Sequence, residues 1–367
     1  MHNRGQMQAQ YQSSPEEQDE QFQKRILQGV SRTFALTIPV LPQPLSRVVS
    51  NAYLLCRIAD TIEDDKQLPD QRKREFSEQF IRVVSGSDNA QDFATRLRPE
   101  ISADATAAEK ELIENTPAVI RITHSFNARQ KAALERCIRI MAEGMTQYQE
   151  TSVRDGLKDQ ADMDRYCYFV AGVVGEMLTE LFCDHCKGID RNRADLMRLA
   201  VSFGQGLQMT NILKDIWDDQ QRGMCWLPQT VFTQYGADLR QLQQGTENQG
   251  FQNALGHLVG VARAHLANAL RYTLLIPAHE AGIRRFCLWA LGMAVLTLRK
   301  INANRAFSSG REVKISRRSV KTTVALTNLL TRHDKLLLWL FNVMARPLPE
   351  CQLPAVFSPV SETVLKM

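Results

Sequence analysis

The chain has 367 residues, of which 44% are hydrophobic and 23% charged, with a formal net charge of +5. This length and composition are typical of a soluble globular protein with a sizeable core. The charge is too small to indicate a nucleic-acid-binding protein, and it is compatible with anionic substrates or an anionic membrane surface. The eight cysteines are scattered, several inside apolar helical patterns, which favours a reducing cytoplasm over a disulfide framework.

The first 20 residues are rich in Gln, Ser and Glu without an apolar core, so we expect a disordered tail and no signal peptide. Helical periodicity then continues to residue 345, and residues 346–367 are expected to form a C-terminal tail. Helices are expected over 21–34, 51–65, 71–85, 105–114, 131–148, 163–183, 203–223, 254–275, 284–302 and 336–345. No stretch alternates as strands do, so the sequence predicts one all-α domain over residues 21–345.

Residues 51–65, NAYLLCRIADTIEDD, predict a helix with one apolar face and one polar face. The polar side carries Tyr53, Arg57, Asp60, Thr61, Glu63 and Asp64. Asp60 and Asp64 lie one turn apart, so their mutual repulsion needs a nearby cation. A divalent metal ion is the obvious candidate.

A second stripe with the same carboxylate spacing occurs in residues 203–223. It consists of Gly204, Gln208, Asn211, Asp215 and Asp219. Two such helices could face one another across a cavity and hold Mg²⁺ between their carboxylates, because hard divalent cations bind carboxylates together with substrate phosphate oxygens. The alternative for either stripe alone is a solvated helix face.

The apolar helix expected over 163–183 contains small and hydroxyl-bearing residues, among them Tyr166, Ala171, Gly172 and Gly175. Glycine disfavours a helix, so two glycines three residues apart indicate the close approach of another group. That group is either a second helix or a substrate chain.

Two segments near the C-terminus have alternative interpretations. The basic segment 305–321 is either solvated surface or a site that grips phosphate groups. Residues Leu336 to Ala345 are too short to span a bilayer and form either a core helix or a peripheral membrane contact, and we expect no spanning helix elsewhere. Cys183-Asp184-His185-Cys186 could be half of a zinc site, although no second Cys/His cluster accompanies it in the sequence.

Four motifs together resemble the squalene and phytoene synthases. They are SRTF (31–34), YLLCRIADTIEDD (53–65), YCYFVAGVVGE (166–176) and QMTNILKDIWDDQQRG (208–223). The D-T-x-E-D-D form of the first acidic motif is most similar to squalene synthases. The resemblance covers residues 20 to 320 and implies an isoprenoid synthase bundle around a central cavity. It also implies Mg²⁺-dependent head-to-head coupling of two farnesyl diphosphates to presqualene diphosphate, followed by NADPH-dependent reduction to squalene.

The resemblance also implies roles for individual residues. The magnesium-binding residues would be Asp60, Glu63, Asp64, Asn211, Asp215 and Asp219, and Tyr166 would act with the aspartates near the departing diphosphate. The substrate-binding residues would be Ser31, Phe34, Tyr53, Arg57, Ala171, Gly175, Gln208 and Asn211. The NADPH-binding residues would be Arg32, Arg57, Lys214, Lys314 and Arg317.

Two departures from the family pattern concern the cofactor. Lys214 stands where the family has an arginine. The positive charge is kept, but lysine cannot make the two parallel hydrogen bonds that a guanidinium group makes to a phosphate. In the segment VKISR, Ser316 stands where reductase-type members have arginine, and Arg317 could substitute for it. An unreduced product, namely dehydrosqualene, hydroxysqualene or presqualene diphosphate, is therefore the alternative.

A di-iron helical bundle would need Glu-x-x-His pairs, which the sequence lacks. A passive lipid-binding protein is the remaining alternative.

Overall fold

The computed structural model describes residues 14–31, 33–150, 153–241, 244 and 248–353. Within these residues the structure is helical, without a β-strand, which confirms the predicted all-α class. The first half contains α1 (Pro15–Val30), α2 (Phe34–Thr37), the 3₁₀ turn η1 (Ile38–Val40), α3 (Gln43–Asp64), α4 (Asp70–Val84), α5 (Ala90–Leu97), α6 (Ala107–Glu114), α7 (Thr116–His124) and α8 (Ala128–Glu150). The second half contains the 3₁₀ turn η2 (Val153–Asp155), α9 (Gln160–Cys167), the π-helical turn η3 (Tyr168–Gly172), α10 (Val173–His185), α11 (Lys187–Asp190), α12 (Arg193–Gln221), α13 (Gln229–Gln234), the 3₁₀ turn η4 (Leu239–Gln241), α14 (Gln249–Leu275), α15 (Ala281–Ala303), α16 (Arg317–Leu330) and α17 (Asp334–Ala345).

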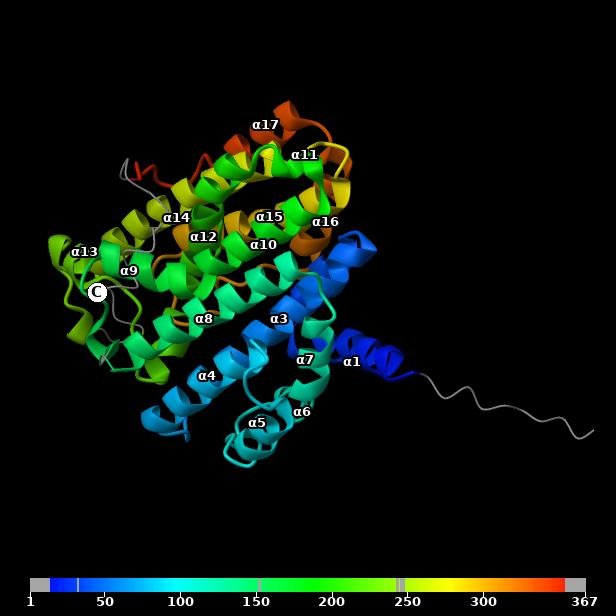
Figure 1. The fold of residues 1–367 in the computed structure, drawn as a ribbon. Coiled ribbons are helices and arrows are strands. Elements are labelled where there is room, and N and C mark those ends of the chain that lie inside the picture. Colours follow the sequence, from blue (N-terminus) through cyan, green and yellow to red (C-terminus); the bar gives the residue numbers. More distant parts are fainter. Residues whose placement is uncertain (1–13, 32, 151–152, 242–243, 245–247, 354–367) are drawn as a thin grey trace, which may run out of the picture.

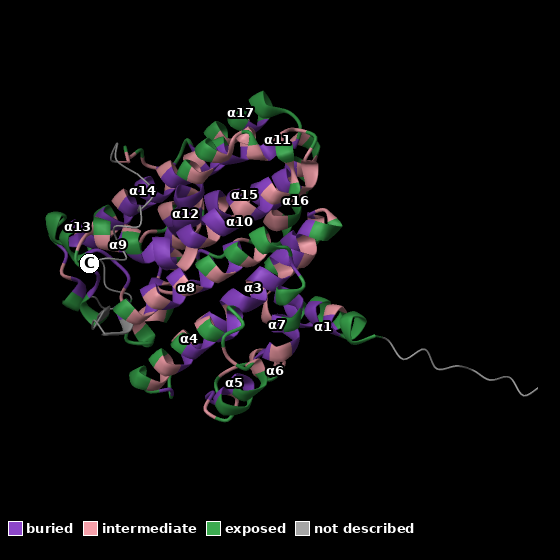
Figure 2. Cartoon of the chain, in the orientation of Figure 1, coloured by how far each residue is buried: buried purple, intermediate pink, exposed green. Residues whose placement is uncertain are grey.

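The 29-residue helix α12 lies at the centre of the bundle and packs against α10, α14 and α15 (Figure 1). Helix α3 packs against α8 and α10. One hydrophobic core connects the N-terminal and C-terminal helices, from Phe22 on α1 to Leu348 beyond α17. Figure 2 shows buried residues along α8, α10 and α12, whereas α17 is largely exposed.

The N-terminal helix begins earlier than expected. The Ser14 hydroxyl accepts a hydrogen bond from the Glu17 amide, and the Glu17 carboxylate accepts one from the Ser14 amide, which forms a capping box. The tail expected through residue 20 is therefore wrong from Pro15 onward. Helix α1 also ends before the expected residue 34, because Ser31 is extended (φ −148°, ψ 130°). Residues 1–13 lie outside the described residues.

The C-terminal tail expected from residue 346 is also partly packed. Leu348 is buried, and Arg263 of α14 donates hydrogen bonds to the Leu348 and Pro349 carbonyl oxygens and to the Glu350 carboxylate. These contacts fix the chain against α14 for several residues after α17. Residues 354–367 lie outside the described residues.

Two apolar helical segments in the described part of the chain are long enough to cross a bilayer by length and composition alone. They are Gln160–His185 and Ala281–Ala303, with 67% and 56% of their most apolar windows buried inside the protein. The expectation of no spanning helix overlooked these segments. Their burial accounts for their apolar composition, because helices in the core of a bundle are hydrophobic on most sides.

Candidate functional site

The last turn of α3 carries the first group of acidic residues. The helix ends because Asp65 is extended and its carboxylate accepts hydrogen bonds from the amides of Gln67, Leu68 and Ser102. These bonds lower the pKa of Asp65 despite its burial. Asp65 therefore anchors the turn that follows α3, whereas Asp60, Glu63 and Asp64 remain available to bind a cation.

Asp60, Glu63 and Asp64 have raised pKa values. Burial and the neighbouring Asp64 raise the pKa of Asp60 to about 7. Burial, Asp64 and Asp60 raise the pKa of Glu63 to about 8. Burial also raises the pKa of Asp64. The Asp64 side chain is exposed to solvent at the end of α3, but the surrounding protein limits its hydration. These carboxylates favour a bound cation or a proton.

The second group of acidic residues faces the first. Burial, then Asp215 and Asp64, raise the pKa of Asp219 on α12 to about 7. Asp219 in turn contributes to the raised pKa of Glu63 on α3. This electrostatic influence in both directions places the end of α3 near the second acidic stripe on α12. We call Asp60, Glu63, Asp64, Asp215 and Asp219 the acidic cluster.

Several cations surround the acidic cluster without neutralising it. They are Arg57 on α3, Lys73 on α4, and Lys214 and Arg222 beside the second stripe. The Lys214 ammonium lies 3.0 Å from the Asp215 carboxylate, and Arg222 lies 3.9 Å from Asp219. Arg57 also forms an ion pair with the carboxylate of Glu109 on α6. The pKa values of Asp60, Glu63 and Asp219 remain raised in the presence of these cations. Carboxylates are the ligands that hard divalent cations such as Mg²⁺ prefer, although in the described residues no three acids of the cluster have ligand oxygens within 4.8 Å of one another.

Tyr166 lies on α9 in the electrostatic field of both acidic stripes. Burial, followed by Glu63, Asp64 and Asp219 among the nearby charges, raises the pKa of its hydroxyl group well above the usual value. Its ring is stacked on Trp226, with centroids 3.9 Å apart, and Tyr148 of α8 contacts both rings edge-on. Trp226 is not predictable as a site residue from the sequence, because its position after α12 bears no periodic relation to the acidic stripe.

The helix predicted over 163–183 is interrupted by η3 and contacts α12 closely. A Cβ atom on Gly175 would lie 2.3 Å from the Ala200 carbonyl oxygen, and one on Gly204 would lie 2.2 Å from the Ala171 carbonyl oxygen. Glycine at both positions lets the backbone of α12 approach those of η3 and α10, as small residues do at tight helix contacts. The structure therefore favours helix packing as the reason for Gly175. Contact of Ala171 and Gly175 with a substrate chain stays a prediction.

The remaining predicted substrate-binding residues lie on or next to α2, α3 and α12. Near the start of α2, the Ser31 hydroxyl accepts a hydrogen bond from the Phe34 amide, and the exposed Phe34 ring contacts Tyr53 of α3. The Tyr53 hydroxyl donates to the Val30 carbonyl oxygen at 3.1 Å. On α12, Gln208 is half-buried and Asn211 exposed. Arg32 lies outside the described residues.

The basic segment before α16 approaches the second acidic stripe. The Trp217 indole donates to the Phe307 carbonyl oxygen at 2.6 Å, and a Cβ atom on Gly310 would lie 3.0 Å from the Lys214 carbonyl oxygen and 3.4 Å from Asp215 Oδ1. Residues 307–310 are thereby held against α12. Lys314 and Arg317 follow this contact and are exposed.

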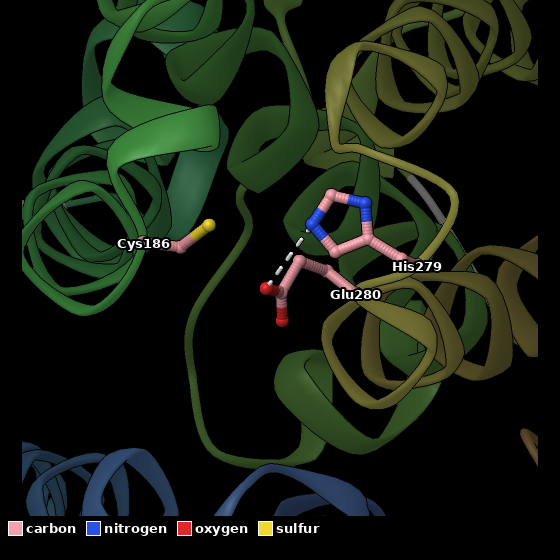
Figure 3. Close-up of side chains that lie close together, drawn as sticks. All are labelled: Cys186, His279 and Glu280. Carbon is pink, nitrogen blue, oxygen red and sulfur yellow. Dashed lines mark ion pairs between the residues drawn. The ribbon is translucent and has the colours of Figure 1, made fainter.

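A second group of metal-ligand residue types lies away from the acidic cluster. Cys186 contacts His279 and Glu280, with the donor atoms of all three within 4.8 Å of one another (Figure 3). His279 is 3.7 Å from Glu280 and largely exposed. Of the Cys183–Cys186 motif only Cys186 belongs to this group, and Cys183 and His185 are not part of it. Structural zinc sites use four protein ligands, so this cluster is one ligand short among the described residues.

Comparison with known proteins identifies the family. The squalene/phytoene synthase family model matches residues 27–319. The squalene synthase of Saccharomyces cerevisiae is 31% identical over 297 residues, which cover 79% of this chain and 63% of that protein. The squalene synthase of Gibberella zeae is 29% identical over 295 residues, covering 80% of this chain and 61% of that protein. The chain thus spans about three fifths of the length of these relatives.

Solved structures show the same fold. The structure resembles that of TcSQS in complex with BPH1237, with a TM-score of 0.71 and 23% identity over 93% of this chain and 94% of that chain. A dehydrosqualene synthase in complex with a ligand has a TM-score of 0.61 and 20% identity, over 86% of this chain and 98% of that chain. The acidic motifs on α3 and α12 and Tyr166 on α9 lie within the residues that the family model matches. The chain belongs to the squalene/phytoene synthase family.

Proposed function

We propose that the protein couples two farnesyl diphosphates head to head to presqualene diphosphate and reduces this intermediate to squalene with NADPH. The observation that carries the proposal is the acidic cluster, in which α3 and α12 face one another beside Tyr166. Ionisation of an allylic diphosphate needs stabilisation of the negative charge that develops on its leaving group. The names of the curated relatives support the same reaction class.

The acidic cluster and Asn211 would hold Mg²⁺, which supplies Lewis-acid neutralisation of the diphosphate when bound. The fit rests on the oxygen-donor chemistry of these acids. The raised pKa values of Asp60, Glu63 and Asp219 support it, since a bound cation would favour their ionised forms. Arg57, Lys73 and Arg222 would add fixed positive charge around the same position. Gln208 and Asn211 would orient the substrate by hydrogen bonding.

Tyr166 would hold a proton at its hydroxyl group beside the departing diphosphate. Its raised pKa keeps the phenol protonated at neutral pH, so it acts as a hydrogen-bond donor rather than as a base. The apolar side chains around the aromatic stack would exclude water from the carbocation that ionisation produces. Ala171, Gly175, Phe34 and Tyr53 would line the path of the prenyl chains.

The reduction step rests on the basic segment that follows α15. Lys214, Lys314 and Arg317, with Arg57 and Arg32, would bind the phosphate groups of NADPH, because lysine and arginine are the usual partners of phosphate. One observation favours the unreduced alternative. Ser316 caps α16 by accepting a hydrogen bond from the Ser319 amide at 3.0 Å, so this position serves the helix rather than an anion.

Product analysis tests both versions. The purified protein is incubated with farnesyl diphosphate and Mg²⁺, with and without NADPH. Squalene formed only with NADPH supports the complete proposal, whereas an unreduced thirty-carbon product in both samples supports the alternative. No thirty-carbon product in either sample would contradict both. A passive lipid-binding protein would bind a non-hydrolysable farnesyl analogue equally with and without Mg²⁺ in isothermal titration.

We also propose a cytoplasmic location with peripheral membrane contact through residues Leu336 to Ala345. The support is the exposure of Leu336, Leu338, Trp339 and Val343 on α17. The thirty-carbon hydrocarbon product is insoluble in water, so release next to a bilayer would be favourable. Vesicle flotation of the wild-type protein and a variant with Trp339→Ser tests the contact, and equal flotation would exclude it.

A further inference from the structure

A cavity lies outside the acidic cluster, between α15, α16 and α17. Its volume is about 380 Å³, within the range of roughly 300–1,000 Å³ that is typical of ligand pockets. One wall is formed by apolar residues of α15, including Leu288, Leu291 and Val295, and the opposite wall by Phe341 and Met344 of α17. None of the acidic residues proposed to bind Mg²⁺ lines it.

The polar residues of α16 that line this cavity present mostly apolar atoms. The hydroxyl groups of Thr323 and Thr327 donate to the carbonyl oxygens one turn earlier, at 2.9 and 2.7 Å. Their methyl groups are therefore free to face the cavity; a Cβ atom on Gly292 would lie 2.5 Å from the Thr323 methyl carbon. Polar groups concentrate at the start of α16, with Ser316, Arg318 and Ser319. The cavity thus combines an apolar interior with a cationic end.

The surface around the cavity is unusually apolar. Nine large hydrophobic residues are exposed in the described part of the chain, and six of them lie on α16 or α17. Leu329 on α16 is 74% exposed, and Trp339 on α17 is 62% exposed. Contiguous exposed apolar surface marks an interaction site, and tryptophan prefers the membrane–water interface.

The segment that contains these two helices is strongly basic. Residues 316–346 contain six Lys or Arg and one acid, a formal charge of +5 that equals the net charge of the whole chain. All six cations are exposed, and none has an acidic partner within the described residues. The single acid, Asp334, is paired with the buried Arg284 at 2.6 Å. Unpaired cations around an apolar surface are complementary to an anionic bilayer.

Arg284 also makes the cavity a preformed feature of the fold. Its guanidinium donates to the Ile276 and Leu274 carbonyl oxygens below it and to the Thr331 carbonyl oxygen between α16 and α17. The Trp289 indole donates to Asn328 of α16 at 3.2 Å. These bonds fix the α16–α17 hairpin on α15, so the cavity does not depend on a ligand to form.

We propose that this cavity binds one hydrocarbon chain of an anionic phospholipid, with the lipid phosphate near Arg318, while α16 and α17 lie on the bilayer surface. A bilayer lipid is favoured over a soluble prenyl diphosphate because only a bilayer would also cover Leu329 and Trp339. The inference rests on the proposed membrane contact of α17 and extends it to α16 and to a specific lipid site. It is independent of the proposed catalytic reaction.

The test measures vesicle binding and lipid retention separately. The full-length protein is incubated with vesicles of phosphatidylcholine and phosphatidylglycerol, floated to measure binding, then recovered by gel filtration and examined by native mass spectrometry. We expect one retained phosphatidylglycerol per protein. Val295→Phe should fill the cavity and abolish retention while flotation persists. Leu288→Phe provides a second filling variant, and an unchanged melting temperature shows that each variant is folded.

A charge variant separates surface attraction from chain binding. Lys321→Glu with Lys335→Glu should lower flotation at least roughly tenfold, since each basic residue near an anionic surface contributes about 1 kcal/mol. Lys24→Glu with Lys187→Glu reverses two exposed cations elsewhere and should leave flotation unchanged. Flotation without retained lipid would overturn the lipid site but leave the membrane contact standing. If the protein neither floated nor retained lipid, both the lipid site and the membrane contact would be overturned. Equal lipid retention in folded Val295→Phe would also overturn the proposed lipid site. Turnover in detergent reports on the catalytic proposal alone.

Discussion

Tyr166 lies flat against Trp226, with ring centroids 3.9 Å apart and planes inclined by 9°. Trp226 belongs to the segment that follows α12, so the stack connects α9 to the end of the second acidic helix. The position of the Tyr166 hydroxyl group beside the acidic cluster therefore depends on a residue that need not contact the substrate itself.

Replacement of Trp226 by Leu should lower kcat roughly 10- to 100-fold, because loss of the stack would let the Tyr166 hydroxyl group move by a fraction of an ångström or more. KM for farnesyl diphosphate should change less than kcat. Trp226→Phe keeps an aromatic face and should recover most of the activity. If Trp226→Leu raised KM alone, Trp226 would contact substrate rather than position Tyr166. Steady-state kinetics with each variant measures both parameters.

Asp60→Asn or Asp215→Asn should reduce turnover by at least about 100-fold, because each removes a carboxylate from the proposed site of leaving-group stabilisation. The melting temperature should stay the same or rise, since repulsion between carboxylates decreases. Asp70→Asn, an exposed acid at the start of α4, is the matched control. Retained activity in both site variants would exclude the model in which two carboxylate stripes act together.

The metal-free protein should become less stable as pH rises. Asp60 and Asp219 ionise near pH 3.8 in the unfolded chain but have pKa values of about 7 in the fold, and Glu63 shifts from 4.5 to about 8. Between these values the folded protein holds protons that the unfolded chain has released, so the free energy of unfolding falls with increasing pH. Thermal unfolding in EDTA from pH 5 to pH 8 measures the effect, and Asp60→Asn should reduce its slope.

Mg²⁺ binding should show the opposite dependence on pH. Ionised carboxylates are required for binding, so affinity should increase from pH 6 to pH 8, by roughly tenfold per pH unit for each proton released. Isothermal titration at the two pH values, in buffers of different ionisation enthalpy, measures both affinity and proton release. Affinity that does not change with pH would mean that these acids do not bind the metal.

Gly175→Ala and Gly204→Ala should each destabilise the protein by about 1–3 kcal/mol, the cost of overpacking a tight contact. Each new methyl group would meet a carbonyl oxygen of the neighbouring helix at less than 2.5 Å. Gly188→Ala is the control, since its Cβ atom would make an ordinary contact of 3.4 Å with Pro277. Chemical denaturation measures the differences. Unchanged stability of both site variants would show that α10 and α12 can separate without cost.

Arg317→Ala should reduce the share of squalene among thirty-carbon products without reducing total coupling, if Arg317 binds a phosphate of NADPH. Lys321→Ala, one turn further along α16, controls for loss of positive charge. Gas chromatography of products formed at limiting NADPH measures the ratio. An equal product ratio in wild-type protein and Arg317→Ala would move the cofactor contact away from α16.

The sequence by itself determined most of the long helices and the two acidic stripes, although α5, α7 and α16 were not expected. Asp60 and Asp64, like Asp215 and Asp219, are four residues apart, and a helix places such residues on one face whatever surrounds it. The capping box of Ser14 and Glu17 was also visible as a local S-x-x-E pattern, so the late start expected for α1 was an avoidable error. Features that depend on a few consecutive residues could be predicted because their geometry is local.

Only the tertiary structure decided how these elements meet. The stacking of Trp226 on Tyr166, the contact of Gly175 with Ala200, and the cavity between α15, α16 and α17 join residues far apart in sequence. The helical period shows which face of α3 is polar, but not which other helix that face will meet. That choice depends on how all the apolar faces pack together at once, which is a property of the whole chain rather than of any segment.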